Sequence, residues 1–162
     1  MNVLVTGSNG FIGKNLIVHL NELENYDVLT FSRENSIDEL KELIIHAGAI
    51  IHLAGENRPK DASAFKIVNT ELTQLLCDEV RSSGRIIPIV FASSIQADFE
   101  NPYGRSKLAA EMIIKKLAIE IGNPTFIYRL PGVFGKWCRP NYNSVVATFC
   151  HNIANGLPIQ IN

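Results

Sequence analysis

The sequence has few cysteines, almost no net charge and no long apolar run. The three cysteines, Cys77, Cys138 and Cys150, are an odd number without CxxC spacing, which predicts neither a disulfide framework nor a metal site. A net charge of −1 offers no basic field for nucleic acid, and no apolar run reaches the length of a transmembrane helix. The chain starts on an apolar strand pattern and not on a signal peptide, so we expect a cytoplasmic protein.

The alternation of apolar patterns predicts one α/β domain. The chain has 162 residues, of which 46% are hydrophobic and 19% charged, enough for a sizeable core. Strand-like runs alternate with helical patterns, which is typical of a Rossmann-like, doubly wound parallel sheet. Only one helix fits between the second and third runs, so we expect about five principal strands in the order 2-1-3-4-5. The expected strands are 3–5, 26–31, 49–53, 86–92 and 125–130, and the expected helices are 11–20, 37–46 (with a Ser36–Glu39 capping box), 62–83, 103–121 and 144–154.

A glycine-rich turn follows the first strand. Its three glycines have Gly-x-x-Gly-x-x-Gly spacing and stand between a strand and a helix. Such glycines let the backbone approach a diphosphate, which then faces the first N–H groups of the helix and the positive end of its dipole. A purely structural turn is the alternative. The predicted dinucleotide-binding residues of this turn are Gly7, Ser8, Asn9, Gly10, Phe11, Ile12 and Gly13.

Open α/β sheets bind ligands at the carboxyl ends of their strands, so the loops that begin at Ser32, Ala54, Ser93 and Pro131 are also candidates. An acidic residue after the second strand would bind the ribose 2′-hydroxyl of NAD. The chain has Arg33 there, and a guanidinium matches a 2′-phosphate, which favours NADP (NADPH) over NAD. A solvated pair between Arg33 and the neighbouring Glu34 is the alternative.

A serine pair and a Tyr-x-x-x-Lys pattern follow the fourth strand. We expect Ser94 in a loop, and Tyr103 and Lys107 one turn apart on the next helix, where both reach one point. A neighbouring ammonium should lower the pKa of Tyr103, and Ser94 should donate to a substrate carbonyl. Together they would polarise a ketone and protonate the alkoxide as hydride arrives from a nicotinamide. The alternative is a tyrosine at a helix start with a solvated lysine.

These motifs together resemble the extended short-chain dehydrogenase/reductase family, also called NAD-dependent epimerase/dehydratase. The matching segments are TGSNGFIG at 6–13, HLAG at 52–55, SSIQ at 93–96 and YGRSK at 103–107. The resemblance implies a nucleotide-sugar enzyme with Ser94, Tyr103 and Lys107 as its catalytic set. It also implies that the cofactor contacts Tyr103 and Lys107 and, in addition, Leu53, Ala54, Gly55 and Pro131.

Further segments are similar to the CapF-type enzymes of capsular polysaccharide synthesis: GENRP at 55–59, NPYG at 101–104 and FGKWCRPNYNSVVATFC at 134–150. This similarity implies NADPH-dependent reduction of the C4 ketone of a UDP 4-keto-6-deoxy N-acetylamino sugar, and a C-terminal cupin domain. In the last segment, the cationic side chains of Lys136 and Arg139 suit the diphosphate of a sugar nucleotide, and Trp137 and Tyr142 suit stacking on one of its rings. The expected substrate-binding residues are Asn57, Arg58, Ser94, Ile95, Gln96, Lys136, Arg139, Tyr142 and Asn143.

The sequence closes on 157–162, which has the pattern of a strand start. We therefore expect an NADP-binding domain over residues 1–162 that ends inside the start of a substrate lobe. Two alternatives stay open: a UDP-sugar 4-epimerase or 4,6-dehydratase that keeps NAD bound, and a fragment that only binds dinucleotide. The helices at 62–83 and 103–121 would pair two copies as a homodimer, or would pack their apolar residues on the sheet; these residues are Leu72, Leu76, Leu108 and Met112.

Overall fold

A computed structural model describes residues 1–161 of the chain. Within these residues, parallel strands form one five-stranded sheet in the order β2-β1-β3-β4-β5. The strands are β1 Asn2–Thr6, β2 Asp27–Phe31, β3 Ala49–His52, β4 Ile89–Ser94 and β5 Thr125–Leu130. The sheet and its strand order confirm the predicted Rossmann-like fold.

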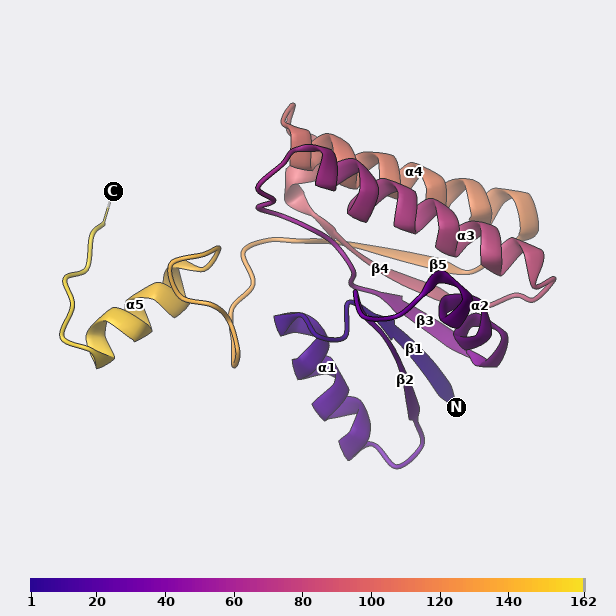
Figure 1. Ribbon diagram of the computed structural model, residues 1–162, viewed down its shortest axis with the longest axis horizontal. Helices are drawn as coiled ribbons and strands as arrows, with labels where there is room; N and C mark the ends of the chain where they lie inside the picture. Colours follow the sequence, from indigo (N-terminus) through magenta and orange to yellow (C-terminus); the bar gives the residue numbers. More distant parts are fainter. Residues whose placement is uncertain (162) are drawn as a thin grey trace. The chain divides into compact units, whose positions relative to one another are not determined.

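Helices lie on both faces of the sheet (Figure 1). On one face, Leu16 and Leu20 of α1 pack against Val3 and Val5 of β1. On the other face, α2, α3 and α4 bury the larger core, to which β1 contributes Leu4. The alternation along β1 arises because successive side chains of a strand point to opposite faces. These helices are α1 Phe11–Glu22, α2 Ile37–His46, α3 Leu72–Ser82 and α4 Pro102–Ile121.

The chain divides into two compact units, Met1–Leu130 and Pro131–Asn162. The first unit holds the sheet. The second contains the helix α5, Val145–Ala154, whose N-cap Ser144 accepts a hydrogen bond from the Ala147 N–H at 3.2 Å. The expected strand at 157–162 is wrong for residues 157–161, which have no strand structure, and Asn162 lies outside the described residues. An apolar run becomes a strand only where a neighbouring strand pairs with it.

Most expected boundaries agree with the structure, and the Ser36–Glu39 capping box is confirmed. The fourth strand differs: it begins after Pro88, which has no N–H to donate, and it continues through Ser94. The last two residues of β4 were expected in a loop, but they pair with Arg129 and Leu130 of β5. Strand pairing at the end of β4 therefore holds Ser94 on the sheet itself.

The expected helix at 62–83 begins with a π-helical segment, η1 Phe65–Glu71, before α3. The expected loop after the fourth strand contains a short 3₁₀ turn, η2 Ile95–Asp98. Both irregular segments adjoin the first turn of α4, and π-helical segments are frequent at functional sites. Among residues 1–161, no helix combines the length and the apolar composition that a membrane span requires.

Candidate active site

The glycine turn after β1 brings three backbone segments into contact. Gly7 has a φ of +70°, and a Cβ on it would lie 2.7 Å from the backbone nitrogen of Ala54. A Cβ on Gly13 would lie 2.5 Å from the Gly7 carbonyl oxygen. Only glycine permits these approaches. In the described residues no side chain caps α1 at Gly10, so its N-terminal N–H groups are suited to an anionic ligand.

A cleft of about 640 Å³ opens beside this turn at the carboxyl edge of the sheet. The predicted residues that line it are Gly7, Asn9, Gly10, Arg33, Leu53, Ala54 and Gly55. The other predicted residues of the turn lie next to it: Ser8 is buried and its hydroxyl donates to the Phe31 carbonyl at 3.2 Å, while 11–13 form the first turn of α1.

Sequence reasoning did not name half of the cleft-lining residues individually. Strand topology had pointed to the loop that begins at Ser32, but the binding residues predicted there did not include Phe31, Ser32, Glu34 or Asn35. The others come from η1 and α3, and no sequence signal distinguishes the helical residues that face a cleft from their neighbours. They are Ile67, Val68 and Leu72.

The predicted catalytic hydroxyls meet at the edge of the sheet. Ser94 ends β4 and Tyr103 lies in the first turn of α4, and the Ser94 hydroxyl acts as a hydrogen-bond donor that lowers the pKa of Tyr103. The Tyr103 ring packs on Phe65 of η1, with the ring centroids 5.8 Å apart. The next residue, Gly104, fixes this helix start, because a Cβ there would lie 2.2 Å from the Gln96 carbonyl oxygen of η2.

Lys107 lies one helical turn after Tyr103 on α4 and reaches the wall of the cleft. Its side chain is buried, and its Nζ donates to the Ala92 carbonyl at 2.7 Å and lies 4.5 Å from the centroid of the Phe91 ring. The Nζ also lies 3.5 Å from the position that a Cβ on Gly55 would take. Since Gly55 lines the cleft, the ammonium group sits against the wall of the candidate cofactor site.

The pKa of Tyr103 does not follow the sequence-based expectation. Burial raises this pKa, and the hydrogen bond to Ser94 offsets only part of the effect. The expected lowering of this pKa is therefore wrong, because burial of the phenol outweighs what favours its charged form. Burial lowers the pKa of Lys107 to about 8, while the Glu111 carboxylate acts to raise it.

Asn69, in the π-helical segment, holds the loop after β3 and was missed by sequence reasoning. Its Oδ1 accepts from the Glu56 N–H at 2.7 Å, and its Nδ2 donates to the Glu56 carbonyl at 2.9 Å. The same Nδ2 donates to the Ser106 hydroxyl at 2.9 Å. These bonds fix the cleft loop to α4 next to Lys107.

A second polar network supports α4 from the sheet. Glu111 is 1% exposed and accepts from the Ser93 hydroxyl at 2.6 Å and from Nε and Nη2 of Arg129 at 2.8 Å each. Burial acts to raise the pKa of Glu111, but the bonds from Arg129 and Ser93 outweigh it and hold this pKa below its ordinary value. The network joins β4, β5 and α4 one turn beyond Lys107.

The predicted substrate residues fall into both units. In the first unit, Asn57 and Arg58 are exposed on the loop after β3, and Ile95 and Gln96 begin η2. The Gln96 N–H donates to the Ser94 hydroxyl oxygen at 3.2 Å, which leaves the hydroxyl proton for another acceptor.

The second unit holds Pro131 and the predicted residues Lys136, Arg139, Tyr142 and Asn143. The two rings expected to stack on a sugar lie beside cations of their own loop: Lys136 Nζ lies 4.6 Å from the centroid of the Trp137 ring, and the Arg139 guanidinium lies 5.8 Å from that of the Tyr142 ring. Trp137 also has a φ of 65°, which is rare for a bulky residue and typical of functional loops.

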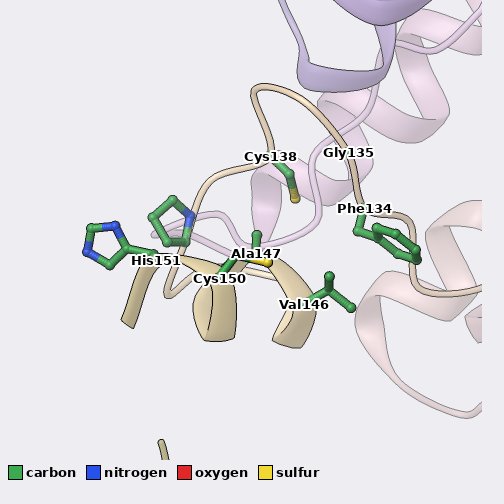
Figure 2. A pocket seen from close by; sticks show the side chains of 8 residues that line it. Phe134, Gly135, Cys138, Val146, Ala147, Cys150 and His151 are labelled. Atoms are coloured by element: carbon green, nitrogen blue, oxygen red, sulfur yellow. The ribbon is translucent and has the colours of Figure 1, made fainter. Parts of the chain in front are cut away.

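A pocket of about 330 Å³ lies within the second unit (Figure 2). The Cys138 side chain points toward α5, where Ala147 and Cys150 lie, and the His151 ring points away. Within residues 1–161, no three His, Cys, Asp or Glu side chains gather into a group that could hold a metal ion. The lining residues are Phe134, Gly135, Cys138, Pro140, Val146, Ala147, Cys150 and His151.

The chain is similar to known proteins along its whole length. It is 57% identical to a UDP-2-acetamido-2,6-beta-L-arabino-hexul-4-ose reductase of Pseudomonas aeruginosa PA103. The crystal structure of the capsular polysaccharide assembling protein CapF from Staphylococcus aureus superimposes with a TM-score of 0.87 at 42% identity. Both similarities cover 100% of this chain, which spans 44% of the length of each relative.

A more distant structure shares the fold. The UDP-glucuronic acid 4-epimerase of Bacillus cereus in complex with NAD superimposes with a TM-score of 0.85 at 20% identity, covering 99% of this chain and 66% of that one. The NAD dependent epimerase/dehydratase family matches residues 3–162. The chain therefore belongs to the NAD-dependent epimerase/dehydratase family, the extended short-chain dehydrogenases/reductases.

Proposed function

We propose that the chain is the cofactor-binding part of a reductase that uses NADPH to reduce the C4 ketone of a UDP-linked 4-keto-6-deoxy N-acetylamino sugar. The product would be a precursor of a capsular or other surface polysaccharide. One observation carries the proposal: Lys107, one helical turn after Tyr103 on α4, places its Nζ against the cleft wall at Gly55, and the Ser94 hydroxyl acts on Tyr103. The similarity to a UDP-sugar 4-ketoreductase supports the choice of substrate class.

The residues of the cleft fit a dinucleotide. Gly7 and Gly13 let the turn pack so closely against the backbone around it that any Cβ would clash, and α1 presents its uncapped start beside the cleft. When bound, the cofactor supplies a hydride to the carbonyl carbon of the substrate. Arg33 lies at the end of β2, where a guanidinium binds a 2′-phosphate, and this placement supports NADPH over NADH.

The side chains of the site then polarise the substrate carbonyl and donate the proton that the reduction requires. The Ser94 hydroxyl donates to the substrate carbonyl oxygen and polarises it, and Tyr103 gives its phenolic proton to the oxygen as negative charge develops there. A raised pKa keeps Tyr103 protonated at neutral pH, which suits a general acid. Lys107, one turn along α4, offers a positive charge to the phenolate that results.

Substitution of Tyr103 by phenylalanine tests this function in the whole reductase. The ring still packs on Phe65, but the proton donor is gone. We expect turnover of the 4-keto sugar to fall at least a hundredfold while the dissociation constant for NADPH changes little. Stopped-flow oxidation of NADPH and a fluorescence titration measure the two quantities. Unchanged turnover in Y103F would refute the assignment.

Two alternatives predict different cofactor behaviour. A UDP-sugar 4-epimerase or 4,6-dehydratase of this family would keep NAD bound through turnover, so the purified protein would contain it. A reductase takes NADPH from solution and releases NADP. A binding module without catalysis would bind dinucleotide and leave every 4-keto sugar unchanged. Extraction and chromatography of the bound nucleotide, followed by a turnover assay, separate the three.

We also propose that a cupin domain follows the reductase and that the whole protein is a homodimer. The exposed α4 residues Leu108 and Met112, which are 38% and 64% exposed, support an apolar contact between copies. Leu76 does not belong to such a face, because it is fully buried in the core, and Leu72 packs partly against that core. Sedimentation of the whole reductase as a monomer would contradict the dimer.

A further inference from the structure

An ion pair connects the two loops on either side of the glycine turn. Arg33 follows β2 and Glu56 follows β3, and their Nη2 and Oε2 atoms lie 2.7 Å apart. Because β1 lies between these strands, the pair joins the loops that flank the start of the dinucleotide cleft. Arg33 and Gly55, the neighbour of Glu56, both line that cleft. The pair also replaces the solvated Arg33–Glu34 pair that the sequence left open.

The two partners are held very differently. The Glu56 side chain is 17% exposed, and its Oε1 accepts from the N–H groups of Asn57 and Arg58 at 3.1 and 3.3 Å. Its backbone is bound on both sides by Asn69. The Arg33 side chain is 79% exposed, and this contact engages one Nη of its guanidinium. The Glu56 carboxylate is thus held in one position, whereas the exposed Arg33 side chain can turn away from it to bind another anion.

We infer that Glu56 sets the preference between cofactors with and without a 2′-phosphate by competing for Arg33. The inference rests on the proposed use of NADPH. A 2′-phosphate binds Arg33 in the presence of the Glu56 carboxylate, and the two anions repel each other. NADH carries no such phosphate, so its binding leaves the Arg33–Glu56 pair intact. Glu56 therefore weakens NADPH binding and leaves NADH binding nearly unchanged.

The size of the effect follows from the exposure of Arg33. Solvent screens an exposed ion pair of this kind. Removing the Glu56 carboxylate should therefore change the affinity of Arg33 for a phosphate by only about two- to fivefold. The Glu56→Gln variant keeps the shape and an oxygen that accepts from Asn57 and Arg58, so the loop should stay in place. We expect E56Q to bind NADPH two to five times more tightly than the wild type, with no change for NADH.

The experiment is a calorimetric titration of the whole reductase with NADPH and with NADH. Glu34→Gln is the matched control, because Glu34 also lines the cleft beside Arg33 but forms no such pair with any of residues 1–161. Tighter NADPH binding in E56Q, with a smaller change in E34Q, supports the inference. Glu56→Asp, which withdraws the carboxylate from Arg33, should shift NADPH binding in the same direction by less.

Three results overturn the inference: unchanged or weaker NADPH binding in E56Q, an equal gain for NADH, or an equal gain in E34Q. The Arg33→Gln variant separates these from failure of the proposed function. If the wild type prefers NADPH and R33Q loses that preference, only the role of Glu56 is refuted. If the wild type binds NADH as tightly as NADPH and R33Q changes neither, the proposed cofactor is refuted and the role of Glu56 with it.

Discussion

Replacing Lys107 by methionine tests the electrostatics of the site most directly. The lysine side chain is 4% exposed, and its Nζ donates to the Ala92 carbonyl at 2.7 Å. Burial lowers its pKa from 10.5 to about 8, and the Glu111 carboxylate offsets part of that effect. Methionine has a similar length and flexibility but carries no charge. A comparison of the two proteins therefore isolates the ionisation of Lys107.

The direction in which the free energy of unfolding changes with pH follows from the number of protons bound by the folded and the unfolded chain. The unfolded chain keeps the ordinary pKa of lysine, so it binds more protons than the folded chain between pH 8 and 10.5. The free energy of unfolding of the wild type therefore rises with pH across this window relative to that of K107M. A pKa that falls from 10.5 to about 8 corresponds to about 3 kcal/mol at roughly 1.4 kcal/mol per pH unit.

Urea unfolding followed by far-ultraviolet circular dichroism, at intervals from pH 7 to pH 10, measures this difference. It should stay constant below about pH 8 and then shift by about 2 kcal/mol in favour of the wild type by pH 10. Lys116→Met is the control, because the Lys116 side chain is 70% exposed on the same helix. A difference between wild type and K107M that stays flat from pH 7 to pH 10 would refute the reasoning.

Two further substitutions test how the site is supported. Gly104→Ala forces a Cβ onto the backbone of η2, so it should lower the free energy of unfolding by about 1–3 kcal/mol and slow turnover. Gly132→Ala is the control, because its Cβ meets no atom of the described residues within 4 Å and should change neither quantity. Urea unfolding measures the stability, and NADPH oxidation measures the turnover. Glu111→Gln removes the buried partner of Arg129 and should cost about 2 kcal/mol at pH 7, less than a fully buried pair because Arg129 is a third exposed. The exposed Glu100→Gln is its control; equal unfolding free energies for the two would contradict a structural role for the buried pair.

The local features of the fold were predictable from the sequence. Apolar periodicity gave the strands and helices, the Ser36–Glu39 spacing gave a capping box, and the count of alternating elements gave the strand order. The glycine spacing after the first strand and the Tyr103–Lys107 spacing gave a candidate site in the same way. Such signals are readable because the interacting residues are neighbours in the chain, or because parallel strands place their carboxyl ends at one edge.

The pKa values and the ion-pair partners of the site residues were decided by the tertiary structure. The pKa of Tyr103 is raised and not lowered, because burial outweighs its hydrogen bond, while Lys107 turns to a carbonyl of β4. Arg33 meets Glu56, 23 residues away, and not its neighbour Glu34. Burial and long-range pairing depend on which distant segments the fold brings together. The periodicity of a single segment does not show which residues these will be. The sequence by itself thus determined which groups are present and on which elements they stand. Only the packing of β3, η1 and α4 around them decided their charge and their partners.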